Sequence, residues 1–236
     1  MADRPAAAIA FIRRASVLGG CAALLASCAS SSRADPGYTV SYQALVPPTD
    51  APPATPGGDL REAAFVDSVL ALMTLPEKLG QVNQYAGSWG PNGVIVDSTV
   101  ERQVRSGQVG SFLSVWGVDA TRRLQRIAVE QSRLKIPLLF AQDVIHGFRT
   151  VFPVPLAEAA SWDPRMAREA ARIAAWEASA YGIHWTFAPM VDIARDPRWG
   201  RIVEGSGEDP YLGSVMAAAR VRGFQGTDLR APTSIA

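Results

Sequence analysis

The most informative part of this sequence is the segment Phe140-Ala141-Gln142-Asp143-Val144-Ile145-His146-Gly147. The run at 136–141 is nearly all apolar, as expected of a parallel strand that is buried on both faces. Asp143 follows this strand directly, and ligands of parallel α/β folds bind at the carboxyl ends of the strands. We therefore predict that Asp143, with His146 after it, reaches a ligand site. The alternative is that Asp143 caps the next turn and that His146 is a satisfied core or loop histidine.

Helix and strand patterns alternate on both sides of this segment. Asp163-Pro164 and Asp209-Pro210 each place an N-cap aspartate before a proline of the first helical turn. Thr74-Leu75-Pro76-Glu77 has the form of a capping box, which predicts a further helix start. The sequence predicts strands at 81–85, 109–115, 136–141 and 184–190, the start of another strand at 233–236, and helices at 59–73, 118–134, 163–181 and 209–223.

This alternation predicts an α/β fold with a parallel sheet. Four or five strand–helix units fit into the chain, whereas a closed (β/α)8 barrel has eight units and usually takes about 250 residues. Periodicity therefore leaves two architectures open. One is a small doubly wound domain, and the other is the N-terminal portion of a TIM-type barrel that is incomplete in this chain.

The composition disfavours several classes of function. The chain has 236 residues and a formal net charge of +1, and its basic residues are dispersed, so no nucleic-acid partner is expected. The two histidines, His146 and His184, lack the spacing of a metal-binding motif. The turn Gly205-Ser206-Gly207 has neither a Walker lysine nor a GxGxxG pattern, so a nucleotide site is not expected either.

Residues 1–28 have the plan of an export signal. Arg13-Arg14 precedes an apolar stretch at 15–27 that is too short to span a bilayer, and the paired arginines leave both the general secretory and the twin-arginine route open. Leu25-Ala26-Ser27-Cys28 resembles the lipobox of bacterial lipoproteins, in which cleavage leaves the cysteine lipidated. The alternatives are a plain secretory signal with an incidental cysteine, and a lipobox that ends at Cys21.

The remaining sequence divides into a tether and a folded domain. Residues 29–58 are rich in Pro, Ala and Ser and are expected to link a lipid anchor on Cys28 to the domain at 59–236. Ala29, in place of aspartate after the cysteine, implies by the same resemblance a protein that is exported to the periplasm and anchored in the outer membrane. Cleavage at Cys28 would leave no disulfide in the mature domain.

A second segment, 190–208, is rich in charge and fits no regular structure. Long irregular loops in compact domains are usually functional or disordered, and the well-capped elements on both sides argue against disorder. An arginine held by acids beside a tryptophan suits a polyhydroxylated ring. The alternative is a network of ion pairs that only orders the loop. The candidate residues are Asp192, Arg195, Asp196, Arg198, Trp199, Arg201, Glu204, Glu208 and Asp209.

The order of five motifs resembles glycoside hydrolase family 3, and most closely its periplasmic β-glucosidase type. The motifs extend from about Leu72 to the end of the chain. The branch that acts on N-acetylglucosaminides carries a Glu-Gly-Gly motif at the position of Asp143, and its absence favours a β-glucosidase or a β-xylosidase. The motifs are Asp143 to Gly147, Thr150-Val151-Phe152-Pro153, Trp185-Thr186-Phe187-Ala188-Pro189, Arg195 to Arg201, and Glu204 to Pro210.

The resemblance implies retaining hydrolysis of terminal non-reducing β-D-glucosyl residues, without a metal or organic cofactor. It assigns binding of a β-glucoside or oligosaccharide to Asp143 and Arg201, and shaping of the site to Trp199, Glu208 and His146. The family's nucleophile and acid/base are expected beyond Ala236, so this chain is expected to be an N-terminal fragment that is inactive alone. A catalytic pair drawn from Asp192, Glu204 and Glu208 is disfavoured. The alternatives are a β-xylosidase of the same family and a non-catalytic sugar-binding lipoprotein.

Overall fold

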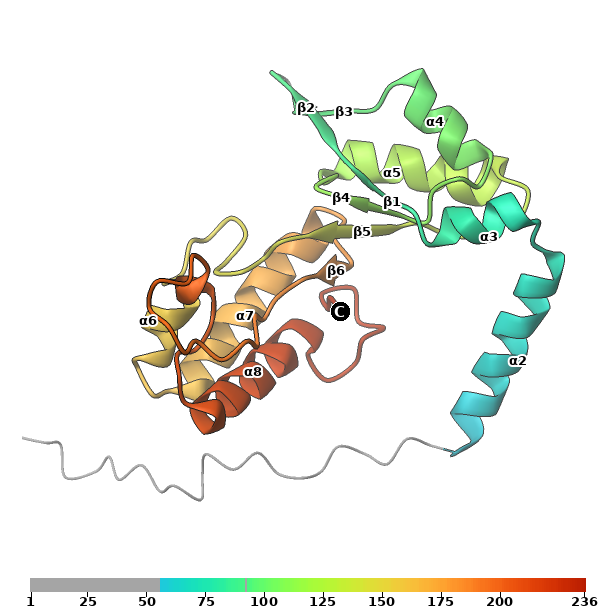
Figure 1. Cartoon of the computed structure of the whole chain (residues 1–236). Helices are drawn as coiled ribbons and strands as arrows, with labels where there is room; N and C mark the ends of the chain where they lie inside the picture. Colours follow the sequence, from blue (N-terminus) through green and yellow to red (C-terminus); the bar gives the residue numbers. More distant parts are fainter. Residues whose placement is uncertain (1–55, 92) are drawn as a thin grey trace, which may run out of the picture. The chain divides into compact units, whose positions relative to one another are not determined.

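A computed structural model describes residues 56–91 and 93–236 of the chain (Figure 1). The expected export signal at 1–28, the lipidation site Cys28 and residues 29–55 of the expected tether lie outside the described residues. Helix α2 (Pro56–Leu72) begins three residues before the expected start of the folded domain. Within the described residues, no helix is both long enough and apolar enough to cross a membrane.

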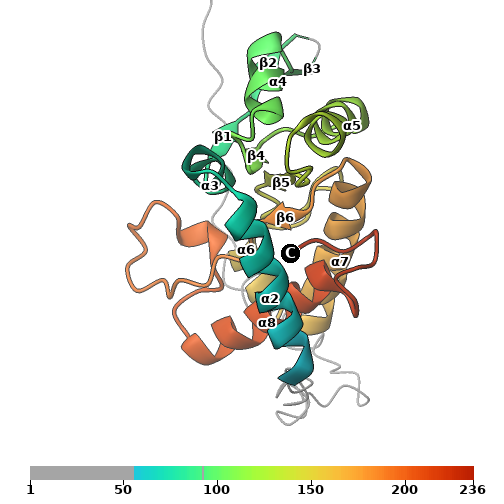
Figure 2. The same ribbon diagram turned by 90° about the vertical axis from the view of Figure 1, so that its right-hand side faces the viewer.

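Four parallel strands form the central sheet. They are β1 (Gln84–Ala86), β4 (Ser111–Leu113), β5 (Leu139–Gln142) and β6 (Trp185–Thr186). Their order in the sheet is β1-β4-β5-β6, so strands that follow one another among these four lie side by side (Figure 2). The prediction of an α/β fold with a parallel sheet is confirmed.

The strands are shorter than predicted, because only their central residues pair with neighbours. Gln81 closes helix α3, so the first strand starts at Gln84. The apolar pattern at 184–190 is paired with β5 only at Trp185 and Thr186, and the chain then leaves the sheet. Residues 233–236 form no assigned strand. Ala236 nevertheless bonds to His184 and Thr186 of the β6 segment, at 2.9 and 2.8 Å, as a parallel neighbour would.

The helices begin largely where their capping residues predict. Asp163 accepts hydrogen bonds from two amides at the start of α7, and Asp209 accepts one from the amide of Tyr211 at the start of α8. The helices after α2 are α3 (Leu75–Gln81), α4 (Ser98–Arg105), α5 (Val118–Arg126) with the π-helix η2 (Ile127–Gln131), α6 (Pro155–Ala159), α7 (Pro164–Ala180), the 3₁₀ turn η3 (Ile202–Glu204) and α8 (Pro210–Gln225).

Some elements were not predicted. Helices α4 and α6 are short, and the hairpin formed by β2 (Ser88–Gly90) and β3 (Gly93–Ile95) has only three residues in each strand. Segments of this length contain too few turns or alternations to show a clear period. The expected helix at 118–134 ends as a π-helix that stops at Gln131.

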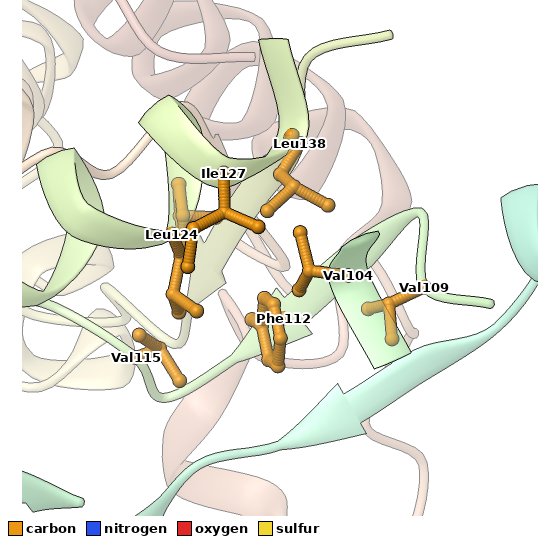
Figure 3. Close-up of a cluster of buried hydrophobic side chains, with 9 residues drawn as sticks. Val104, Val109, Phe112, Val115, Leu124, Ile127 and Leu138 are labelled. Atoms are coloured by element: carbon orange, nitrogen blue, oxygen red, sulfur yellow. The ribbon is translucent and has the colours of Figure 1, made fainter. Parts of the chain in front are cut away.

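Two main clusters of buried apolar side chains join the helices to the sheet. The first cluster includes Phe112 of β4, Phe140 of β5 and side chains from α4, α5 and η2 (Figure 3). The second cluster includes Phe224 of α8 and several side chains of α7, and the buried residues of α7 are alanines. These small side chains let α8 approach closely: a Cβ on Gly223 would lie 2.4 Å from the carbonyl oxygen of Arg168.

Candidate functional site

The candidate site lies at the carboxyl ends of β5 and β6. Asp143 is the first residue after β5, and the irregular charged segment follows β6. Because β5 and β6 are parallel neighbours, their carboxyl ends meet at the same edge of the sheet. The topology therefore brings together the two segments that the sequence singled out.

A buried hydroxyl fixes the backbone on which Asp143 sits. The amide of Val144 donates to Thr186 Oγ1 over 3.2 Å, and the amide of Ala188 lies 3.4 Å from the same oxygen. Val144 is fully buried and Thr186 is 5% exposed, whereas Asp143 is exposed. The carboxylate of Asp143 thus stands in solvent on a backbone held by the next strand, as a ligand-binding group requires.

His146 closes the loop that follows Asp143. Its Nδ1 lies 3.0 Å from the carbonyl oxygen of Phe152, and the amide of Phe152 donates to the carbonyl of His146 over 2.8 Å. Since a carbonyl only accepts, the first contact requires the proton on Nδ1. This arrangement agrees with the alternative of a satisfied loop histidine, and a role of His146 in shaping the site stays a prediction.

Arg201 is held side-on by Glu204. Its Nε lies 3.1 Å from both carboxylate oxygens, and its Nη2 donates to Oε2 over 2.6 Å. The side chain of Arg201 is 59% exposed and that of Glu204 is 24% exposed. Because Glu204 contacts Nε and Nη2, the Nη1 amino group of Arg201 has no hydrogen-bond partner among the described residues and is open to a ligand.

The charges of the site act on one another. The hydrogen bond to Glu204 raises the pKa of Arg201, and the negative charges of Asp192 and Asp143 act in the same direction. The hydrogen bond from Arg201 lowers the pKa of Glu204, which therefore stays ionised at neutral pH and is a poor general acid. The structure thus brings Asp143, Asp192 and Glu204 into the field of one guanidinium group.

Other charges of the segment order it, as the alternative interpretation expects. Arg198 forms a pair with Asp196, with Nη2 and Oδ2 2.6 Å apart, and the amide of Trp199 donates to the carbonyl of Asp196 over 3.0 Å. The hydrogen bonds that Arg198 donates to Asp196 also raise the pKa of Arg198. In the described part of the chain, the side chain of Glu208 makes no hydrogen bond or ion pair, so its role stays a prediction.

A buried ion pair behind the site was missed from the sequence. Arg220 of α8 lies 3.4 Å from Glu158 of α6, both side chains are 5% exposed, and Arg220 Nη2 also donates to the carbonyl of Ile145. Burial raises the pKa of Glu158 and lowers that of Arg220. Arg220 stands four residues from each of the buried side chains Met216 and Phe224, so helical spacing could have placed it in the core.

The charged side chains at this edge of the sheet can form hydrogen bonds with the hydroxyl groups of a ligand. A carboxylate accepts hydrogen bonds from them and a guanidinium donates to their oxygens. Among residues 56–91 and 93–236, no three side chains of His, Cys, Asp or Glu gather as metal ligands would.

Comparisons with known proteins identify the family. A model of the glycosyl hydrolase family 3 N terminal domain matches residues 74–233, and the chain belongs to this family. A periplasmic β-glucosidase of Salmonella typhimurium is 44% identical over 163 residues, which cover 69% of this chain and 21% of that protein. A β-xylosidase of Formosa agariphila is 37% identical over 110 residues, which cover 42% of this chain and 15% of that protein.

A solved structure decides between the two architectures that periodicity leaves open. The crystal structure of a β-glucosidase from Listeria innocua in complex with glucose matches with a TM-score of 0.64 and 34% identity, over 73% of this chain and 26% of that chain. The parallel sheet is therefore the N-terminal portion of a TIM-type barrel and not a small doubly wound domain. The chain spans about a fifth of the length of the Salmonella relative and about a quarter of the Listeria chain.

Proposed function

We propose that this chain supplies part of the sugar pocket of a retaining exo-β-glucosidase, which removes terminal non-reducing β-D-glucosyl residues. The observation that carries the proposal is the placement of Asp143 and Arg201 at one sheet edge, close enough for their charges to interact. The name of the Salmonella relative and the glucose bound to the Listeria enzyme support the choice of sugar.

Each residue has a part in this proposal. Asp143 accepts hydrogen bonds from the hydroxyls of the terminal sugar, and Arg201 donates to them through Nη1 while Glu204 orients it. Trp199, Glu208 and His146 shape the surrounding loops. A carboxylate supplied from outside residues 1–236 attacks the anomeric carbon, and a second one protonates the leaving oxygen and then activates water.

A β-xylosidase is the second candidate, because the Formosa relative carries that name. Glucose and xylose differ in the hydroxymethyl group at C5, so the two activities are separated by comparing aryl β-glucosides with aryl β-xylosides. A non-catalytic sugar-binding lipoprotein would bind glucose or cellobiose and hydrolyse neither glycoside.

We also propose that the protein is exported to the periplasm and anchored in the outer membrane through a lipid on Cys28. The name of the Salmonella relative supports the compartment, and the lipobox-like residues support the anchor. The variant Cys28→Ala should move the protein from the membrane fraction to the soluble periplasmic fraction. Unchanged membrane association would contradict the anchor.

The catalytic proposal is tested with the protein expressed from its complete reading frame. It should hydrolyse 4-nitrophenyl β-D-glucoside faster than the β-D-xyloside, and residues 1–236 expressed alone should hydrolyse neither. Asp143→Asn should lower kcat/KM by about tenfold or more, because hydrogen bonds to a charged group contribute about 1.5–3 kcal/mol. Asp67→Asn, on the exposed surface of α2, is the matched control. A wild-type kcat/KM in Asp143→Asn would overturn the role of Asp143.

A further inference from the structure

Glu177 of α7 makes an unusual set of hydrogen bonds for a helix carboxylate. Its Oε2 accepts from the amides of Arg149 and Thr150 over 2.7 and 2.8 Å, and its Oε1 accepts from the Thr150 hydroxyl over 2.6 Å. All three donors belong to the loop that carries Asp143. One side chain on a helix therefore holds the tip of the loop after β5.

The loop beyond Asp143 is a small closed hairpin. Phe152 pairs with His146 at its base, and Gly147 forms an antiparallel bridge with Val151. The chain turns tightly because Gly147 has a φ of +107°, and a Cβ there would lie 1.9 Å from the carbonyl oxygen of Thr150. The base of this hairpin is three residues from Asp143, so the hairpin directly continues the segment that carries the carboxylate.

The helix that carries Glu177 is a firm support. Ala174, three residues before Glu177, and Ala178, directly after it, are at most 1% exposed and belong to the core shared with α8. The pKa of Glu177 is lowered: burial alone would raise it, but the hydrogen bonds from Thr150 and Arg149 outweigh burial. The group is therefore a carboxylate at neutral pH, and the three donors face a full negative charge.

A second contact docks the same hairpin on the neighbouring strand end. The ring of Phe148 lies edge-on to Trp116, with centroids 5.7 Å apart, and to Tyr181 at 5.3 Å. Trp116 follows β4, so the aromatic contact packs the hairpin against the carboxyl end of β4, the strand that pairs with β5. Glu177 holds the tip, and Phe148 packs against Trp116 and against Tyr181 at the end of α7, so two independent contacts hold the hairpin.

We propose that Glu177 is a positioning residue for the sugar pocket, which acts through the hairpin 146–152 to place the carboxylate of Asp143. This inference rests on the proposed function and deepens it. The hairpin tip is exposed, so water can replace the lost carboxylate at the two amides. Removing Glu177 therefore has a small effect on folding and a larger effect on substrate binding.

The test uses the protein from its complete reading frame, with Glu177→Ala, the conservative Glu177→Gln and the control Glu169→Ala from the exposed face of α7. Glu177→Ala should raise KM for 4-nitrophenyl β-D-glucoside more than it lowers kcat, with a loss in kcat/KM of about tenfold to a hundredfold, the range that a misplaced binding group produces. Glu177→Gln keeps an acceptor oxygen for the amides and should recover part of the loss. Glu169→Ala should match the wild type.

Hydrogen exchange provides a readout that does not depend on activity. Glu177→Ala should speed exchange in peptides that cover 143–152 and leave α8 unchanged. Unchanged exchange at 143–152 overturns the proposal, and so does faster exchange with an unchanged KM. A lower Tm with an unchanged KM would assign Glu177 a purely structural role. If the wild type hydrolyses no β-glycoside, the proposed function fails, and the exchange result alone then decides whether Glu177 orders the Asp143 segment.

Discussion

Arg220 and Glu158 show how single residues support a site that they do not enter. They form an ion pair that is almost fully buried, and Arg220 also holds the carbonyl of Ile145, two residues after Asp143. One carboxylate oxygen of Glu158 and Nε of Arg220 are buried without a hydrogen-bond partner among the described residues. Such a pair is sensitive to the loss of one member, because the other is then a buried charge without a counterion.

This sensitivity predicts opposite results for single and double substitutions. Glu158→Leu should lower stability by about 3–5 kcal/mol, the usual effect of breaking a buried pair, and the double variant Glu158→Leu with Arg220→Met should recover most of it. The measurement is the Tm by calorimetry. Arg230→Ala, which breaks the exposed pair with Asp228, is the control and should change little. A double variant less stable than Glu158→Leu would contradict this account.

For single residues, the candidate site residues could be predicted from the sequence, but the residues that hold them in place could not. Asp143 was predicted because an apolar strand ends directly before it, and Arg201 because its loop is rich in charge and matches a family motif. Glu177 and Thr186 were missed, since their hydrogen-bond partners are 27 to 42 residues away in the sequence, and Glu158 was missed because its partner, Arg220, lies on another helix. No local period encodes such contacts.

Among the elements, α3 shows how one capping residue joins separate parts of the chain. Glu77 accepts from the amide and hydroxyl of Thr74, over 2.9 and 2.8 Å, and thereby completes the predicted capping box. It also pairs with Arg133, which donates in addition to the carbonyl of Leu72 at the end of α2. The hydrogen bond from Arg133, followed by those from Thr74, lowers the pKa of Glu77 from 4.5 to about 2.

The lowered pKa of Glu77 predicts a defined pH dependence. A carboxyl group with a lower pKa in the folded state adds stability that is full above pH 4.5 and is lost as the pH falls toward about 2. The Tm difference between the wild type and Glu77→Gln should therefore be largest at neutral pH and shrink through this window. Glu62→Gln, on exposed α2, should give a small difference throughout. A difference for Glu77→Gln that does not change with pH would contradict this role of Glu77.

Element types were predicted better than element ends. The well-capped helices α7 and α8 begin at the predicted residues, because an aspartate followed by a proline fixes the first turn locally. Strand lengths were overestimated, because an apolar run continues past the residues that have a partner in the sheet. The boundaries of β5 and β6 are set by pairing between strands that are distant in sequence.

At the scale of the whole molecule, the described part of the chain supplies one wall of a barrel. The outer edge of β1 has no strand beside it among the described residues, and large apolar side chains on α2 and α3 and just after α3 are exposed, with Phe65 at 68%, Leu75 at 69% and Val82 at 79%. Strand periodicity could not distinguish a small domain from part of a barrel. The distinction required the family match, because it depends on which strands close the sheet.

A crystal structure of the protein from its complete reading frame with bound glucose would show whether Asp143 and Arg201 together bind the terminal sugar. We expect glucose hydroxyls within hydrogen-bond distance of the Asp143 carboxylate and of Arg201 Nη1, with Glu204 still bound to Nε and Nη2 of Arg201. Glucose bound in a pocket that neither residue touches would contradict it.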